Sequence, residues 1–151
     1  MANPELSKPE ALAKAQAYCA RAEHCAADVR RKLYEWQVNP LFFDSIEEKL
    51  YEDDYLNDTR FCRAYVHDKV AYQRWGRMKI QAGLRALNLP EKTIREALEN
   101  IDETLYFNNL RALIASRKVE WLDTQPAIRE DKCLRFLLQR GFTYEEIKNC
   151  K

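Results

Sequence analysis

One spacing of apolar residues occurs three times along the 151 residues of this chain. Each copy has four apolar residues separated by 4, 5 and 5 positions, and the later copies begin 51 and 53 residues after the copy before them. The copies are Val29, Leu33, Val38 and Phe43; Ile80, Leu84, Leu89 and Ile94; and Cys133, Leu137, Phe142 and Ile147. A period of this length is typical of one supersecondary unit repeated in tandem, each unit burying its apolar face against its neighbours.

The composition favours helices inside these units. The chain has only 3 Gly and 5 Pro, and 46% of its residues are hydrophobic. Leu, Ala, Glu, Lys and Arg outnumber the β-branched residues, which argues against a β-sandwich or a β-barrel. Each copy reads as helix, turn, helix, short loop and helix. We therefore predict an all-α protein with nine helices in three tandem, helix-turn-helix-like repeats, at residues 1–56, 57–102 and 103–151.

Local signals predict where several helices begin and end. Capping boxes, in which Ser or Thr is followed three positions later by Glu, open the first and last helices at Ser7 and Thr143. Asp58 is the predicted N-cap of the fourth helix. Asn88 and Gly141 are predicted to close the fifth and eighth helices in the left-handed conformation.

Helical periodicity also predicts which side chains face the core. In the fifth helix the predicted apolar stripe includes Met78 together with Ile80 and Leu84. In the seventh helix it includes Leu105 and Leu122, and also Leu110, Leu113, Ile114 and Trp121. These assignments test how far periodicity specifies the face that a helix buries.

The positive charge of the chain is concentrated in one segment. Residues 60–95 contain nine Lys or Arg and two Asp or Glu, although the net charge of the whole chain is only +1. Aromatic residues lie among these cations, a pattern that favours a phosphate-rich or acidic partner. A solvated helix surface is the alternative, since long cationic side chains also cover apolar neighbours. The predicted binding residues are Arg60, Arg63, Lys69, Arg74, Arg77, Lys79, Arg85, Tyr65 and Trp75.

No catalytic or cofactor motif occurs in the sequence. The chain has no Walker loop, no GxGxxG and no GxSxG. His24 with Cys25 and Cys62 with His67 are the only Cys/His neighbours, and they do not supply the paired ligands of a zinc site. Asp53 with Asp54 is better explained as a turn than as a catalytic carboxylate pair. We expect no enzymatic activity, no metal and no cofactor.

The cysteines and the hydropathy predict a cytoplasmic protein. Five cysteines are an odd number, and they form no CxxC pair. No apolar run approaches the roughly 20 residues that span a bilayer. The first residues also lack the layout of a secretory signal. We expect a soluble monomer with free thiols and no contact with a membrane.

Several segments resemble one known family. Residues 55–66, YLNDTRFCRAYV, are similar to the "yLDDerFAraYv" signature of the RecX regulatory proteins of bacteria. Residues 25–33 resemble that family's S-x-x-E-L-x-x-K-L segment, and residues 76–94 resemble its middle repeat. Residues 138–147, LQRGFTYEEI, resemble its terminal RRGF element. The resemblance covers residues 11–149 in the expected order. Asn57 and Cys62 are departures, standing where the family has Asp and Ala.

The resemblance implies a fold and a partner. It implies that the chain, like other members of the RecX family, consists of three tandem three-helix repeats that form an elongated, curved array. Members of this family bind the RecA recombinase on single-stranded DNA, in the groove of the nucleoprotein filament. They limit filament extension and restrain strand exchange, ATP hydrolysis and co-protease activity, in DNA repair and the SOS response. Single- or double-stranded DNA is a further candidate ligand, and the sequence does not decide whether the chain binds it directly.

Two other functions fit an all-α repeat protein. One is a tandem helix-turn-helix transcriptional regulator, which needs recognition helices carrying Arg, Asn or Gln toward base edges. The second helices of the three repeats differ in their charge patterns, so they match this requirement poorly. The other is an inert helical scaffold, which predicts no effect on any filament.

Overall fold

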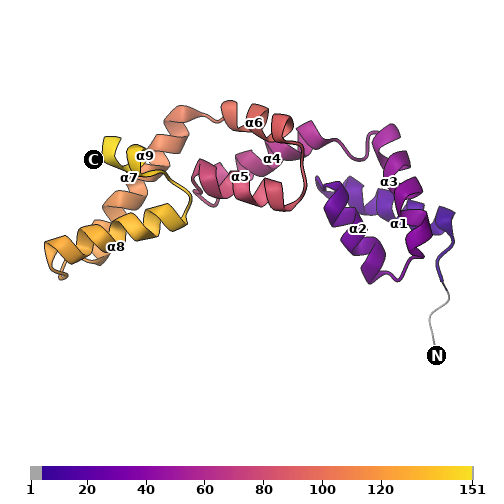
Figure 1. The fold of residues 1–151 in the computed structure, drawn as a ribbon, viewed down its shortest axis with the longest axis horizontal. Helices are drawn as coiled ribbons and strands as arrows, with labels where there is room; N and C mark the ends of the chain where they lie inside the picture. The colour runs from indigo at the N-terminus through magenta and orange to yellow at the C-terminus, as the bar shows by residue number, and fades with distance from the viewer. Residues whose placement is uncertain (1–4, 151) are drawn as a thin grey trace. The chain divides into compact units, whose positions relative to one another are not determined.

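The structure, a computed structural model, describes residues 5–150 and is helical throughout them (Figure 1). Within this range it has no strand, and one short 3₁₀ helix (Pro40–Phe42) precedes the third of nine α-helices. The helices are α1 (Lys8–Arg21), α2 (Ala26–Glu35), α3 (Phe43–Glu52), α4 (Asp58–Ala71), α5 (Arg77–Ala86), α6 (Glu91–Glu99), α7 (Glu103–Glu120), α8 (Pro126–Gln139) and α9 (Tyr144–Asn149). The predicted all-α class with tandem three-helix repeats is confirmed.

The chain divides into two compact units, and the division falls between Ala64 and Tyr65 inside α4. The first unit contains α1, α2 and α3, and the second contains α5 to α9. None of the helices in residues 5–150 is long and apolar enough to cross a bilayer. The finer division into repeats at 1–56, 57–102 and 103–151 stays a prediction.

A turn after the second helix of each repeat explains the repeated spacing. In the first repeat the N–H of Val38 donates to the carbonyl of Leu33 at 3.0 Å. This bond closes a ring that spans six residues. The same bond joins Leu89 to Leu84 at 3.3 Å and Phe142 to Leu137 at 3.1 Å. This is the Schellman motif, which packs an apolar residue after the helix against one in its last turn. The first interval of five in each copy is therefore the span of that turn.

The turn requires one residue with a positive φ in each repeat. These residues are Gln37 (φ 59°), Asn88 (φ 62°) and Gly141 (φ 101°). The predictions for Asn88 and Gly141 are confirmed. Gln37 gave no signal in the sequence, because Gln is not typical of the left-handed region.

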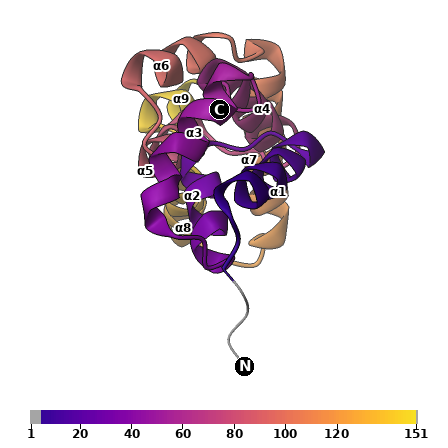
Figure 2. The same cartoon turned by 90° about the vertical axis from the view of Figure 1, so that its right-hand side faces the viewer.

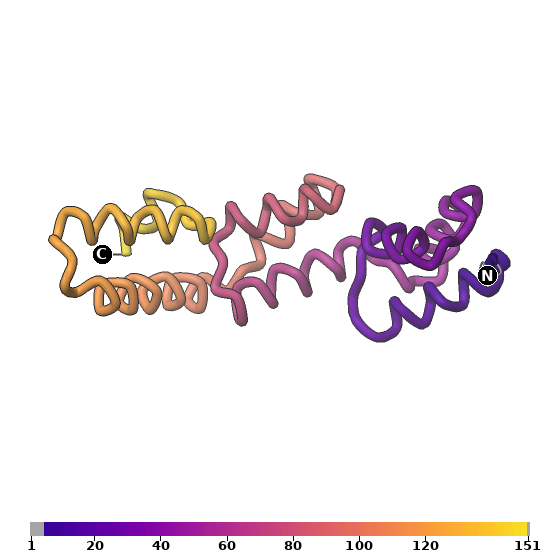
Figure 3. Tube along the Cα trace, turned by 90° about the horizontal axis from the view of Figure 1, so that it is seen from below, coloured from indigo at the N-terminus to yellow at the C-terminus, as the bar shows by residue number. Residues whose placement is uncertain are grey.

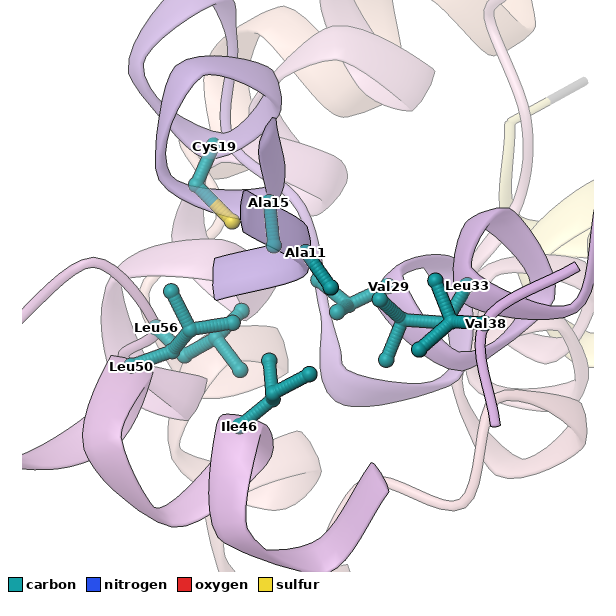
Figure 4. Packing of buried hydrophobic residues seen from close by; sticks show 9 residues of the cluster. All are labelled: Ala11, Ala15, Cys19, Val29, Leu33, Val38, Ile46, Leu50 and Leu56. Carbon is teal, nitrogen blue, oxygen red and sulfur yellow. The ribbon is translucent and has the colours of Figure 1, made fainter. Parts of the chain in front are cut away.

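Helices α1, α2 and α3 enclose the core of the first unit (Figures 2 and 4). Ala11, Ala15 and Cys19 recur every four residues along one face of α1, and all three are buried. The small side chains let this helix lie close to its neighbours. The other core residues are Val29, Leu33, Val38, Ile46, Leu50 and Leu56.

Backbone hydrogen bonds join the second and third repeats inside the second unit. The loop between α8 and α9 lies against the start of α5 (Figure 3). The N–H of Gly76 donates to the carbonyl of Arg140 at 2.7 Å, and the N–H of Met78 donates to Gly141 at 3.0 Å. The Arg77 N–H donates to the Tyr106 hydroxyl at 3.0 Å. The third repeat therefore satisfies the first N–H groups of α5, which have no partner inside the helix.

Gly76 is required at this junction because no side chain fits there. A Cβ at Gly76 would lie 2.2 Å from the carbonyl carbon of Gly141. A Cβ at Gly141 would lie 2.5 Å from the backbone nitrogen of Lys79. The two repeats thus meet backbone against backbone.

Helix α7 buries Leu110, Leu113 and Ile114 as periodicity predicted, and it also buries two residues with polar groups that periodicity did not predict. Leu105 is exposed, and Leu122, which lies beyond the end of the helix at Glu120, is 67% exposed, whereas Tyr106 and Asn109 are buried. The Asn109 Nδ2 donates to the carbonyl of Val70 at 2.8 Å and so satisfies an acceptor at the end of α4. The buried face of α7 therefore combines the predicted apolar residues with two polar groups that bond to the second repeat.

Two further local predictions are corrected. Met78 is 53% exposed, because its helix presents Ile80 and Leu84 to the core instead. The N-cap of α4 is Asn57 and not Asp58, since the Asn57 Oδ1 accepts the Arg60 N–H at 2.9 Å. The capping boxes at Ser7 and Thr143 are confirmed.

Candidate functional site

Two lysines flank the indole ring of Trp75. The Nζ of Lys69 lies 4.5 Å from the ring centroid, and the Nζ of Lys79 lies 4.3 Å from it. Lys69 also lies over the ring of Tyr65, at 5.2 Å. We name Tyr65, Lys69, Trp75 and Lys79 the Trp75–lysine cluster. All four are half-buried, and all four were predicted from the basic segment.

The turn that ends α4 positions Trp75. The Trp75 N–H donates to the carbonyl of Lys69 at 2.9 Å, so the chain folds back over the last turn of the helix. Arg74 makes this possible by adopting a φ of 55°. Lys79 comes from the first turn of α5, so the cluster joins two helices and the loop between them. Sequence neighbours alone would not have placed both ammonium groups on one ring.

The cluster carries positive charge that is not neutralised by carboxylates. Within residues 5–150 neither Lys69 nor Lys79 forms an ion pair, and the exposed side chain of Arg74 forms none either. An ammonium over an indole ring gains about 0.5–1 kcal/mol at an exposed site, and it keeps its full charge. Burial raises the pKa of the Tyr65 hydroxyl, so this group stays protonated at neutral pH. The arrangement suits a polyanion with planar groups.

Arg60 has a structural role within the first unit. Its guanidinium pairs with Glu23 at 2.6 Å and with Asp54 at 3.1 Å. It also donates to the carbonyls of Asp54 and Tyr55. These bonds hold the loop before α4, in which Asp54 adopts the uncommon φ of 61°. Arg63, one turn further on, is exposed and forms no ion pair within the described residues.

Arg77 and Arg85 lie in a groove whose charges are balanced. The groove has a volume of about 740 Å³ and is lined by Arg77, Gln81, Arg85, Glu91, Arg95, Leu98, Glu99 and Glu103. Arg77 pairs with Glu103, and with Glu146 at 2.8 Å. Arg85 binds both oxygens of Glu91, at 2.7 and 3.1 Å, and this hydrogen bonding lowers the pKa of the Glu91 carboxyl. These two cations already have anionic partners.

The sequence prediction missed Arg140. Its guanidinium donates to the carbonyl of Gln73 and lies 3.5 Å from that of Arg74, so it borders the loop that carries Trp75. Arg140 comes 66 residues after Arg74 in the sequence, outside the basic segment. A segmental charge count has no means of finding such a residue.

The cysteines of the first unit are buried. Burial raises the pKa of the Cys19, Cys25 and Cys62 thiols to about 11, so they remain protonated at neutral pH. Residues 5–150 contain no group of three or more His, Cys, Asp or Glu side chains that could hold a metal ion.

Comparison with known proteins identifies relatives over nearly the whole chain. The family described as "RecX, second three-helix domain" matches residues 57–98. The Regulatory protein RecX of Chlorobaculum tepidum is 30% identical over 147 residues, which are 95% of this chain and 88% of that protein. The Regulatory protein RecX of Ralstonia pickettii is 26% identical over 131 residues, covering 87% of this chain and 79% of that protein.

Solved structures share the fold. The crystal structure of RecX from Lactobacillus salivarius matches with a TM-score of 0.81 at 19% identity, covering 95% of this chain and 93% of that one. A second crystal structure of regulatory protein RecX matches with a TM-score of 0.84 at 20% identity, covering 99% of this chain and 81% of that one. With a relative 30% identical along almost its full length, this chain belongs to the RecX family of regulatory proteins.

Proposed function

We propose that this chain binds the RecA recombinase and its single-stranded DNA filament as a non-catalytic regulator. It inhibits filament extension, strand exchange, ATP hydrolysis and co-protease activity, and it acts in the cytoplasm in DNA repair and the SOS response. The observation that carries this proposal is 30% identity to a RecX protein over 95% of the chain. RecA regulation is the role that the resemblance to this family implies.

The Trp75–lysine cluster supports the proposal by supplying a surface for the filament. A nucleoprotein filament presents phosphates and acidic side chains in its groove, and unpaired cations are attracted to both. Lys69, Lys79 and Arg74 are such cations, whereas Arg60 and Arg85 are already paired. Weak contacts from several repeats of one chain then act together and raise the avidity for a repeating partner.

An ATPase assay with the cognate recombinase tests the function. Single-stranded DNA activates hydrolysis, and this chain is titrated into the preformed filament. We expect hydrolysis to fall at sub-stoichiometric amounts of the chain. Unchanged hydrolysis together with sequence-specific duplex binding would instead support a transcriptional regulator. Unchanged hydrolysis without DNA binding would support a scaffold.

A matched pair of variants tests the surface. The double variant Lys69→Gln/Lys79→Gln removes the two ammonium groups on Trp75, and Lys92→Gln/Arg95→Gln removes two exposed charges on α6 as the control. We expect the first to weaken inhibition about tenfold at ~0.1 M salt and to flatten its salt dependence. The control should change inhibition little. Equal losses in both variants would exclude a specific role for the cluster.

A further inference from the structure

A second group of cations lies in the second unit, around the ring of Phe136. The Cζ of Arg117 is 4.6 Å from the ring centroid, and the Cζ of Arg140 is 5.7 Å from it. The Arg140 Nη2 lies 3.5 Å from the backbone oxygen of Arg74. We name Arg74, Arg117 and Arg140 the arginine triad. Its members come from the α4–α5 loop, α7 and the end of α8, so the fold brings them together from distant parts of the sequence.

The triad has too few anions to balance it. Within the described residues Arg140 donates only to backbone carbonyls, Arg74 forms no ion pair, and Arg117 pairs only with Glu120. The Nε atoms of Arg117 and Arg140 are buried and have no hydrogen-bond partner. Partly buried guanidinium groups normally gain a carboxylate, because an unpaired charge is costly to remove from water.

The positive charges of Arg74 and Arg117 act against that of Arg140. The pKa of Arg140 is lowered, first by burial and then by the positive charges of Arg117 and Arg74. Arginine remains protonated at any physiological pH, so Arg140 stays positively charged within the field of the other two cations. An anion at this position would relieve both the repulsion and the loss of hydration. The feature is thus electrostatically unfavourable in the free chain and becomes favourable with a ligand.

Aromatic residues lie next to members of the triad in space or in sequence. Trp75 follows Arg74 directly, and its ring carries Lys69 and Lys79. Trp121 lies edge-on to Phe136 with 6.4 Å between centroids, and it has Arg117 at 5.7 Å from its ring. Cations interleaved with aromatic rings are the composition of grooves that bind single-stranded nucleic acids. A guanidinium also matches the paired oxygens of a phosphate.

We propose that the arginine triad binds the phosphodiester backbone of a single-stranded nucleic acid. The inference deepens the proposed function, since it locates the contact of this chain with the DNA strand of the filament. It adds Arg117 and Arg140, which lie outside the basic segment, to the binding surface. An acidic protein surface would fill the charge requirement alone and would not use the neighbouring rings.

The test measures direct binding without any recombinase. A fluorescein-labelled oligothymidylate of about 20 nucleotides is titrated with the full chain at several salt concentrations. We compare the wild type with Arg117→Gln/Arg140→Gln and with the control Lys92→Gln/Arg95→Gln. Removing one cation from a phosphate should reduce the slope of log K against log salt by about 0.7. We expect the slope for the triad variant to fall by about 1.4 and that for the control to stay almost the same.

Further measurements guard against loss of folding. Arg140 holds the loop at Gln73, so the charge-keeping variant Arg117→Lys/Arg140→Lys is tested in parallel. It should retain most of the salt slope, because the charges remain. Inorganic phosphate should raise the melting temperature of the wild type above that in chloride of equal ionic strength. The glutamine variant should show no such rise.

Three outcomes would overturn the inference. They are equal salt slopes in the triad variant and the control, no phosphate effect on the wild type, and binding of oligoglutamate in preference to oligothymidylate. Because recombinase is absent, these outcomes leave the ATPase result untouched. If inhibition fails while oligothymidylate binds at the triad, the proposed function is wrong and the nucleic-acid site stands.

Discussion

Individual cations in this chain have different roles according to the groups nearest to them. Arg60, Arg77 and Arg85 each lie within hydrogen-bonding distance of a carboxylate. Lys69 and Lys79 lie over an aromatic ring and have no carboxylate partner within the described residues. A paired charge contributes little to attraction at a distance, whereas an unpaired one contributes fully. Substitutions at these two groups should therefore affect different properties.

Arg77→Gln should destabilise the fold. The Arg77 side chain is half-buried, and it neutralises Glu146, whose side chain is only 14% exposed. Glu146 would keep the Thr143 N–H that it accepts in the capping box of α9, but its other, largely buried carboxylate oxygen would lose the guanidinium. We expect a decrease of about 1–3 kcal/mol in the free energy of unfolding, measured by urea denaturation. Lys79→Gln is the comparison and should change this quantity by less than about 0.5 kcal/mol.

An equal effect of both substitutions on unfolding would contradict this division of roles. The result also matters for functional work. A charge reversal that includes Arg77 would mix loss of folding with loss of binding, so binding is better tested at Lys69 and Lys79.

The buried thiols of the first unit should make its stability fall at alkaline pH. Burial raises the pKa of Cys62 from 9.0 to about 11 in the folded chain, and Cys19 and Cys25 behave alike. Above about pH 9 the unfolded chain therefore releases protons that the folded chain retains. The stabilisation is complete below pH 9 and is lost as the pH rises through about 11.

Urea denaturation at pH 8 and pH 10.5 measures this decrease. Lysines also titrate in this range, so the comparison is between variants. Cys62→Ala should lose less stability between the two pH values than the wild type loses. Cys150 is only half-buried, and although burial raises the pKa of its thiol as well, Cys150→Ala should reduce the decrease less than Cys62→Ala does. Identical decreases for wild type and Cys62→Ala would exclude the thiol as a cause.

At the scale of the helices, the contact between α5 and the α8–α9 loop holds the second and third repeats together. The N–H groups at the start of α5 donate to Arg140, to Gly141 and to the hydroxyl of Tyr106. An ordinary helix cap would use a side chain of its own segment. Here the cap is supplied by the next repeat, so capping one helix also fixes the position of the third repeat on the second.

Gly76→Ala should disrupt this connection, and Gly83→Ala should not. A Cβ at Gly76 would meet rigid backbone at 2.2–2.3 Å, whereas a Cβ at Gly83 would meet the flexible tip of Tyr65 at 2.1 Å. Gly83 lies inside α5, where Ala gains up to about 1 kcal/mol in helix propensity. We expect Gly76→Ala to lower the melting temperature by more than ~5 °C and Gly83→Ala to change it by less than half as much. Similar melting temperatures for the two variants would argue against a backbone contact at Gly76.

The two compact units of the chain differ in the sign of their net charge. Residues 1–64 contain nine Lys or Arg and twelve Asp or Glu, a balance of −3. Residues 65–151 contain sixteen and twelve, a balance of +4. The Trp75–lysine cluster and the arginine triad both belong to the second unit. A polyanionic partner should therefore engage mainly this unit.

Hydrogen exchange on the complete chain checks this expectation. Adding a recombinase filament on single-stranded DNA should slow exchange in the α4–α5 loop and near Arg117 and Arg140. Exchange in α1 and α2 should change much less, because the first unit has a net negative charge. Protection confined to residues 8–35 would contradict a binding surface in the second unit.

Much of the fold follows from the sequence because the rules involved are local. The interval of four is one turn of helix, and the first interval of five is the Schellman turn that closes α2, α5 and α8. The capping boxes and the left-handed residue Gly141 determine helix ends through bonds to residues only a few positions away. The errors lie where distant contacts override local preference. Asn109 is buried because it donates to Val70 at the end of α4, a contact that periodicity does not encode.

The binding surface shows the same division. Composition located the positive charge in residues 60–95, and the resemblance of residues 55–66 and 138–147 indicated the family. Folding then determined which cations are neutralised, since a carboxylate far along the chain can lie within hydrogen-bonding distance of a guanidinium. It paired Arg77 with Glu146, 69 residues away, and brought Arg140 to the loop of Trp75. Helix period and turn type depend on neighbours in sequence, whereas the net charge of a surface depends on neighbours in space.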